Sequence, residues 1–369
     1  MSRATMTVRR LTRRSLLFGA AGGVLADLIG PRGSLAAVAA RAGLGGARAP
    51  VLFERVLGSA PAGAVLSLEL GRNADLVGLL WSGAPSARPQ MRLAGREGPW
   101  SPWVGAGEHG HAPDGAPPGI LKVGDPLWTG GASRVQVRSE QALKQLRLSC
   151  VDVSGGVGAR RQARWQGPLA LVAALPLVAP TLPAGPGQPP IVARRAWAQG
   201  LARPRVTPEY GAVQMAFVHH TQSPNGYSPG EVPAMLRAIF AFHRDVKGWN
   251  DIGYNFVIDL YGRIFEARAG GVDEPVVGAQ AGGYNLVSTG VAVLGEFAGS
   301  PISAPAAGAL ERLLAWKLSL HGRPALGRVT VRVNPAGAVY SRFPANARVS
   351  LPRVAGHRDG DSTDCPGDA

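Results

Sequence analysis

The sequence predicts an all-β sandwich-like domain followed by an α/β domain with a mixed central sheet flanked by helices. Residues 50–154 contain short segments of alternating polar and apolar residues, separated by Gly, Pro and Asp. Segments of this kind are typical of antiparallel sandwiches. From residue 191 onward, strand-like segments alternate with helix-like ones, which indicates an α/β domain. A chain of 369 residues is long enough for two such domains.

The composition excludes several classes of protein. With 46% hydrophobic residues the chain can form real cores, so wholesale disorder is not expected. Two cysteines cannot form a disulfide-rich scaffold or a four-cysteine zinc cluster, so a metal site must use histidine or carboxylate ligands as well. No apolar run reaches the roughly 18 to 20 residues of a membrane span, and we predict no integral membrane span.

The net charge of +15 does not predict a nucleic acid partner. Residues 1–50 hold eight Arg and one Asp, so the remaining chain carries only +8. The 35 Arg and 4 Lys stand in an Ala/Gly/Pro-rich background, which points to genome base composition. Along the sequence there is no basic stripe interleaved with aromatic residues and no recognised nucleic-acid-binding motif.

The N-terminus predicts export. Residues 12–17, Thr-Arg-Arg-Ser-Leu-Leu, match the twin-arginine pattern, and residues 37–39 offer an A-x-A cleavage site. We therefore expect residues 1–45 to be a twin-arginine signal and the start of the mature chain. The alternative is an Arg-rich tail with a short anchor helix.

The predicted β-rich domain spans residues 50–154, with its clearest strands at 65–70, 134–138 and 146–153. Four tryptophans are spread through it: Trp81, Trp100, Trp103 and Trp128. We favour packing in the core and at sheet edges for these rings over a glycan-binding aromatic face. Residues 155–190 are dense in Gly and Pro and are predicted to be a linker.

The second domain is predicted at residues 191–369, apparently truncated at its C-terminus. The expected elements are a strand ending at 215–218, a helix at about 230–244, a strand pair at 255–260 and 263–267, a strand at 290–294 and a helix at about 306–321.

Three residues of this domain are candidate zinc ligands. His219 follows a strand with a buried character, while His357 and Cys365 lie eight residues apart in a Gly/Asp-rich segment that can fold both side chains toward one point. Two imidazoles and one thiolate would leave a fourth tetrahedral position for water, as in catalytic zinc sites. On spacing alone, a structural histidine and a buried cysteine remain the alternatives.

Three motifs resemble the zinc N-acetylmuramoyl-L-alanine amidases of the peptidoglycan recognition protein (type 2 amidase) family. The resemblance covers residue 191 to the end and rests on residues 217–221 (FVHHT), 248–256 (GWNDIGYNF) and 356–367 (GHRDGDSTDCPG). The β-rich domain and linker resemble a region that often precedes such amidases in exported actinobacterial proteins.

The resemblance implies roles for single residues. His219, His357 and Cys365 would bind zinc, and His220 would pack or act in the outer shell of the site. Tyr254 matches a tyrosine that in the family lies near the zinc-bound water and the scissile carbonyl. Thr363 matches a family position beside the metal. A core tyrosine and a loop-capping threonine are the alternatives.

The resemblance also implies a peptide groove. Gly248 and Trp249 match a Gly-Trp pair that the family associates with peptidoglycan whose stem peptides carry meso-diaminopimelate. Arg268 and Asn285 fall in segments that line the groove, and His220 is a further candidate there. The alternatives are a turn-forming glycine, a packing tryptophan and a surface arginine.

The implied reaction is hydrolysis of the amide bond between muramic acid and L-alanine in peptidoglycan by zinc-activated water. The sequence departs from the family pattern at two positions near the predicted groove: Gln280 stands where relatives often have His, and Glu296 stands where they usually have Asn. The motifs contain no obvious general base, and Glu231, Glu266 and Glu296 remain open candidates.

Two rival interpretations stay open. Family members that lose the cysteine ligand become non-catalytic peptidoglycan-binding receptors, and the presence of Cys365 favours the enzyme. Alternatively, Cys365 could form a disulfide with Cys150 after export, giving a structural wall protein.

Overall fold

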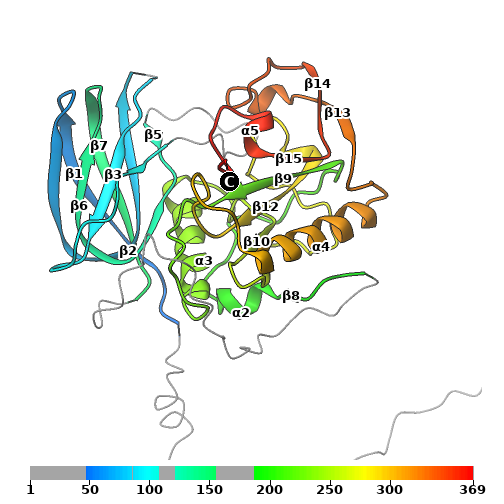
Figure 1. Ribbon diagram of the computed structural model, residues 1–369, viewed down its shortest axis with the longest axis horizontal. Helices are drawn as coiled ribbons and strands as arrows, with labels where there is room; N and C mark the ends of the chain where they lie inside the picture. Colours follow the sequence, from blue (N-terminus) through cyan, green and yellow to red (C-terminus); the bar gives the residue numbers. More distant parts are fainter. Residues whose placement is uncertain (1–46, 85, 108–120, 155–186, 369) are drawn as a thin grey trace, which may run out of the picture. The chain divides into compact units, whose positions relative to one another are not determined.

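The computed structural model describes residues 47–84, 86–107, 121–154 and 187–368, and Arg48–Ala369 form one compact unit (Figure 1). The predicted twin-arginine signal and most of the predicted linker lie outside the described residues. Within the described part of the chain, no helix is both long and apolar enough to span a membrane.

The first part of the described chain is all-β, as predicted. Its strands lie in the order β1-β7-β2-β6-β3-β4, with β5 paired to β2, and every pairing is antiparallel. The strands are β1 (Val51–Ala60), β2 (Val65–Gly83), β3 (Gln90–Ala94), β4 (Val104–Gly105), β5 (Lys122–Val123), β6 (Leu127–Arg138) and β7 (Leu143–Asp152).

Strand β2 is much longer than the alternating segment 65–70 that predicted it. Its first half alternates between exposed and partly buried residues, but residues 74–81 are all buried. This second half pairs with β7 and lacks a polar face, so it carries no period-2 signal in the sequence.

The second part of the chain has a mixed six-stranded sheet with strand order β15-β9-β12-β10-β11-β8. β9 pairs in parallel with β12 and β15, while β10 and β11 form an antiparallel pair. Helices lie beside this sheet in Figure 1, which confirms the predicted α/β class. Its strands are β8 (Ile191–Val192), β9 (Met215–His220), β10 (Phe256–Ile258), β11 (Ile264–Glu266), β12 (Ser288–Val293) and β15 (Val354–Gly356), and its helices are α2 (Arg194–Ala198), α3 (Val232–Ala241), α4 (Ala304–Leu320) and α5 (His357–Gly360).

Strand β9 packs on both faces because successive side chains point in opposite directions. Met215 and Phe217 join a core cluster with a small hairpin, β13 (Arg328–Arg332) and β14 (Arg348–Pro352), which the sequence did not predict. Ala216, between them, belongs to the larger core cluster that includes α3 and α4. This alternation fixes the faces on which the following two histidines lie.

The helix predicted at about 230–244 changes its geometry near its end. After α3, residues Phe242–Val246 form a π-helical turn, closed by a hydrogen bond from the Lys247 N–H to the Phe242 carbonyl at 3.0 Å. Single π-turns of this kind occur frequently at functional sites. This one carries His243, whose side chain is buried.

Helix α4 fixes the segment after β11 through a buried lysine. Lys317 is only 2% exposed, and its Nζ donates to the carbonyls of Val272 and Glu274 at 2.7 and 2.8 Å. Burial lowers the pKa of Lys317 from 10.5 to about 8. Below pH 8 the amine is charged in both the folded and the unfolded state. Between pH 8 and 10.5 the unfolded state binds more protons than the folded state, so the free energy of unfolding rises with pH in this range.

We therefore expect the free energy of unfolding of the wild type, relative to Lys317→Met, to rise by about 3 kcal/mol between pH 8 and 10.5. Urea denaturation of both proteins across this pH range measures the difference between their free energies of unfolding. The titration of other groups affects both proteins equally and cancels in this difference. A difference that is flat with pH would show that the lysine is not buried as a charged group.

Candidate metal centre

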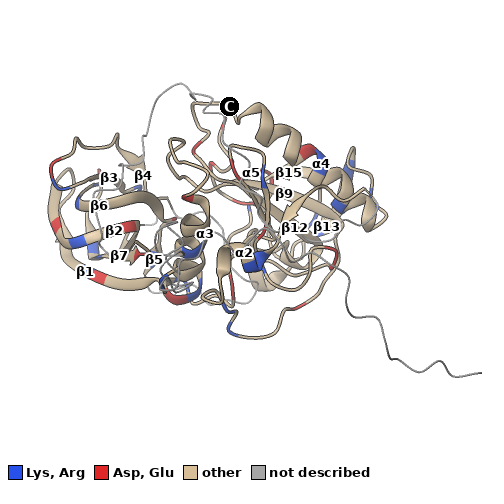
Figure 2. Cartoon of the chain, turned by 90° about the horizontal axis from the view of Figure 1, so that it is seen from below, with Lys and Arg blue, Asp and Glu red and all other residues tan. Residues whose placement is uncertain are grey.

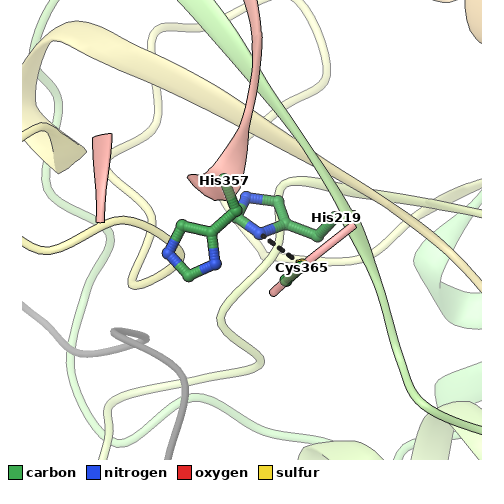
Figure 3. Close-up of side chains that lie close together, drawn as sticks. All are labelled: His219, His357 and Cys365. Carbon is green, nitrogen blue, oxygen red and sulfur yellow. Dashed lines mark hydrogen bonds between the residues drawn. The ribbon is translucent and has the colours of Figure 1, made fainter. Parts of the chain in front are cut away.

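Three side chains that are far apart in the sequence meet at one point. His219, His357 and Cys365 are each 0% exposed, and one ligand atom from each lies within 4.8 Å of the others. The Cys365 Sγ is 3.8 Å from the His219 Nδ1, and the two imidazole centroids are 4.5 Å apart. Figure 3 shows His219 coming from one strand and the other two side chains from the C-terminal segment.

Strand alternation separates the paired histidines. His219 lies on the same face of β9 as Phe217, whose ring also contacts the His357 ring at 6.5 Å between centroids. His220 points to the opposite face, where its Nδ1 is 3.7 Å from Glu296 Oε1. Its backbone N–H remains near the centre and donates to Cys365 Sγ at 3.4 Å.

A buried carboxylate orients His357. Asp361 Oδ2 lies 2.9 Å from His357 Nε2, and both side chains are 0% exposed. The two residues are four apart across α5, so one short helical turn brings them together. Since Nε2 faces the carboxylate, Nδ1 is the nitrogen of His357 available as a metal ligand. Sequence analysis assigned no role to Asp361, although its i+4 spacing from His357 was a usable signal.

The donor set fits a zinc ion. Burial raises the pKa of the Cys365 thiol well above its ordinary value, while the N–H of His220 acts in the opposite direction. A metal cation must therefore displace the thiol proton on binding, as coordination normally does. Two imidazoles, one thiol and a carboxylate behind one imidazole match the ligands and outer partner of catalytic zinc sites.

Tyr254 lies beside the three ligands. Its ring is 4% exposed and its centroid lies 5.4 Å from that of His219 and 5.7 Å from that of His243. Burial raises the pKa of the Tyr254 hydroxyl well above 10, with further contributions from Asp125 and Cys365. The hydroxyl is therefore protonated at neutral pH, as it would be at its ordinary pKa, and can donate a hydrogen bond.

His243 braces the segment that carries Tyr254. Its Nδ1 accepts a hydrogen bond from the Gly253 N–H at 3.1 Å, and its ring lies 4.5 Å from the Trp249 ring. A Cβ on Gly253 would come within 2.8 Å of Trp249, so glycine is needed there. Sequence analysis did not assign His243 a role, because a histidine within an apolar helical segment resembles an ordinary core residue.

Gly248 and Trp249, both predicted to bind substrate, form the turn after the π-helix. Gly248 adopts φ +75°, a conformation that favours glycine. Trp249 is 5% exposed and lies 4.9 Å from Lys247 Nζ, which forms a 2.9 Å ion pair with Asp125 from the β-rich segment. Within the compact unit Arg48–Ala369, this pair ties the turn to the loop before β6.

Arg268 and Asn285 are both buried. Arg268 is 9% exposed and its Nη1 donates to the Ile252 carbonyl at 2.9 Å. Asn285 is 1% exposed and its Oδ1 accepts from the backbone N–H groups of Gln280 and Ala281. These contacts brace the backbone, and binding of substrate by either residue stays a prediction.

Thr363 also holds backbone. Its Oγ1 accepts a hydrogen bond from the Cys365 N–H at 3.1 Å, the contact expected for a loop-capping threonine. Its catalytic role stays a prediction. Both cysteines are free, so the structure does not contain the Cys150 to Cys365 disulfide of the rival interpretation.

Two family models match this chain. Residues 209–368 match the model described as "N-acetylmuramoyl-L-alanine amidase", and residues 54–164 match "Rv3811 N-terminal galactose-binding domain-like". Together they cover most of the α/β part, with the candidate centre, and most of the β-rich part.

Curated relatives carry related names. The chain is 32% identical over 185 residues to an N-acetylmuramoyl-L-alanine amidase of Mus musculus, covering 50% of this chain and 30% of that protein. It is 36% identical over 107 residues to a peptidoglycan-recognition protein of Drosophila simulans, covering 29% and 56% respectively. The chain thus spans about a third to a half of these relatives. Among solved structures, wild-type Drosophila PGRP-LB is 26% identical, covering 48% of this chain and 87% of that one, with a TM-score of 0.36.

Proposed function

Because residues 209–368 of this chain match the family model described as "N-acetylmuramoyl-L-alanine amidase", we propose that the protein is a zinc-dependent peptidoglycan hydrolase. It would cleave the amide bond between N-acetylmuramic acid and the L-alanine of the stem peptide. The observation that carries the proposal is the buried set of two imidazoles and one thiol at His219, His357 and Cys365.

Zinc held by these three residues would supply a Lewis acid for the scissile carbonyl and a water of lowered pKa. The protein's own groups provide orientation and hydrogen bonds. Asp361 fixes the tautomer and ring position of His357, and Phe217 packs against both imidazoles. Tyr254, whose buried hydroxyl lies beside the three ligands, would donate a hydrogen bond to the oxyanion that forms when the carbonyl is attacked.

Release of free stem peptides from purified sacculi tests the proposal. We expect release at about pH 7, loss of release after removal of zinc by a chelator, and recovery on addition of zinc alone. Sacculi with diaminopimelate and with lysine stems are compared side by side, and we propose faster cleavage of the diaminopimelate type on account of Gly248 and Trp249. Binding to sacculi without release of peptide would instead support the non-catalytic recognition module.

Replacing Tyr254 by phenylalanine is expected to lower kcat about 100-fold, because the variant loses one oxyanion donor. Zinc content, measured by mass spectrometry of the metal, is expected to stay at the wild-type level. Tyr210→Phe is the matched control, since that exposed hydroxyl donates to the Gly270 carbonyl and should leave the rate unchanged. Equal rates for the two variants would exclude Tyr254 as an oxyanion donor.

We further propose export by the twin-arginine route, with residues 1–45 as signal and start of the mature chain, 50–154 as β-rich domain, 155–190 as linker and 191–369 as amidase domain. The motif at residues 12–17 and relatives named as peptidoglycan-recognition proteins support this placement at the cell wall.

A further inference from the structure

Two tryptophans of the β-rich part lie on the sheet surface rather than in its core. Trp81 and Trp128 are 1% and 2% exposed, as the packing interpretation predicted, whereas Trp100 and Trp103 are only partly buried. Ser101, between the latter two, exchanges hydrogen bonds with Leu93 of β3: its N–H donates to the Leu93 carbonyl and its Oγ accepts from the Leu93 N–H. This pairing holds the Trp-Ser-Pro-Trp segment against the sheet.

Three arginines alternate with these two rings. Arg134 lies 5.1 Å from the Trp100 centroid, Arg92 lies 5.3 Å from Trp100 and 4.6 Å from Trp103, and Arg138 lies 4.2 Å from Trp103. The result is a continuous stack in the order Arg134, Trp100, Arg92, Trp103, Arg138, which we call the Arg–Trp stack. No stripe was visible in the sequence because the arginines come from β3 and β6 and the tryptophans from the loop between β3 and β4.

The sheet holds the arginines in place. Register pairs Gln90 with Arg138 and Arg92 with Gln136, so these side chains share one face. Arg92 Nε donates to Gln136 Oε1 at 2.7 Å, and Arg138 Nε donates to Gln90 Oε1 at 2.8 Å. Within the described residues these bonds use Nε alone, which leaves the Nη donors of both arginines for another partner.

Arg134 is held more firmly, through the carbonyls of Gly95 and Gly98. Its register partner on β2 is Glu69, an exposed acidic residue. Figure 2 marks basic residues in blue around β3 and β6. At about 3.3 Å per residue, the four-residue step from Arg134 to Arg138 spans about 13 Å, which suits an extended polymer better than a single small anion.

We propose that the Arg–Trp stack is a binding site for an anionic polysaccharide that bears carboxylate or phosphate groups along its chain. Stacking fixes the guanidinium planes, and their Nη edges suit bidentate contact with carboxylate or phosphate. Two guanidinium groups lie over each ring, Arg92 and Arg138 over Trp103 and Arg92 and Arg134 over Trp100, so the rings offer less free surface for stacked nucleobases. The site would hold the enzyme on a charged wall polymer independently of the amidase centre.

The test is binding of the full chain to fluorescein-labelled polygalacturonate and to a phosphodiester-linked mannan, at about 150 mM salt. Fluorescence anisotropy gives the Kd, and the two glycans distinguish carboxylate from phosphate recognition. We expect Arg92→Gln/Arg138→Gln to weaken binding of the preferred glycan at least about tenfold, since two charged donors are lost. Arg92→Lys/Arg138→Lys is also expected to weaken it, because lysine retains the charge without the planar fork.

The matched control is Arg48→Gln/Lys144→Gln, which removes two exposed positive charges elsewhere and should leave the Kd within about twofold of wild type. If the first double variant does not fold, Arg138→Gln alone, at an exposed side chain, is expected to weaken binding about threefold. The proposal is overturned if neither glycan binds, if the stack variants bind as tightly as the control, or if an oligothymidylate of similar charge binds as tightly as either glycan.

Discussion

Replacing Cys365 by serine is expected to lower stem-peptide release by more than about 100-fold and to abolish stoichiometric zinc binding. The thiol is completely buried beside the two imidazoles, and serine offers a much weaker ligand at the same position. Loss of an outer partner of a metal site already costs about 10- to 100-fold, so loss of a ligand should cost more. Zinc content and peptide release are measured on the same preparation.

The chain offers a matched control for this substitution. Cys150 is also 0% exposed, but it lies in the β-rich part, where burial raises the pKa of its thiol to about 12. Cys150→Ser should therefore retain zinc and activity while disturbing a core to a similar degree. Cleavage that persists in Cys365→Ser, or is lost equally in both variants, would contradict the zinc mechanism.

Replacing Asp361 by asparagine is expected to weaken zinc binding by about 10- to 100-fold. Asparagine keeps the shape of the side chain but removes the charge that holds His357 Nε2, so Nδ1 becomes a weaker and less oriented ligand. Competition with a chromophoric chelator measures the zinc Kd directly. At saturating zinc, most of the activity should return, which distinguishes a positioning role from a catalytic one.

Asp364→Asn is the control for that variant. Asp364 is exposed in the same C-terminal segment, so its replacement removes an equal charge without touching His357. We expect its zinc Kd to remain within about twofold of wild type. If Asp361→Asn and Asp364→Asn have the same zinc affinity, the carboxylate at position 361 does not orient the ligand.

The three candidate metal ligands could be proposed from the sequence because they stand in motifs, whereas Asp361 and His243 were not assigned a role. Asp361 stands four residues after His357, but the helix that joins them is a single turn, so only this spacing, and no longer periodicity, indicated that the two side chains meet. His243 lies in an apolar helix whose end widens into a π-turn, and local sequence does not indicate which ring a buried histidine will contact. These contacts depend on tertiary packing, which pairs residues from separate elements.

The fold was likewise predictable only where an element has a clear local pattern in the sequence. Alternation predicted the half-exposed segment 65–70 of β2 but not its fully buried extension, which has no polar face. The β13–β14 hairpin is largely exposed, with an alternating apolar face that covers β9. The helix predicted at about 306–321 was found at Ala304–Leu320, since a long helix with a serine N-cap carries strong local signals.

The doubled histidine of β9 has a consequence for how the metal ligand is specified. A one-residue deletion within the strand would place His220 where His219 now stands, so an imidazole would still reach the centre. The same deletion would turn Met215 or Phe217 away from the apolar cluster that they fill against the β13–β14 hairpin. Either imidazole would thus face the candidate centre in one register, but only the observed register also fills the core, so hydrophobic packing selects His219 for that position.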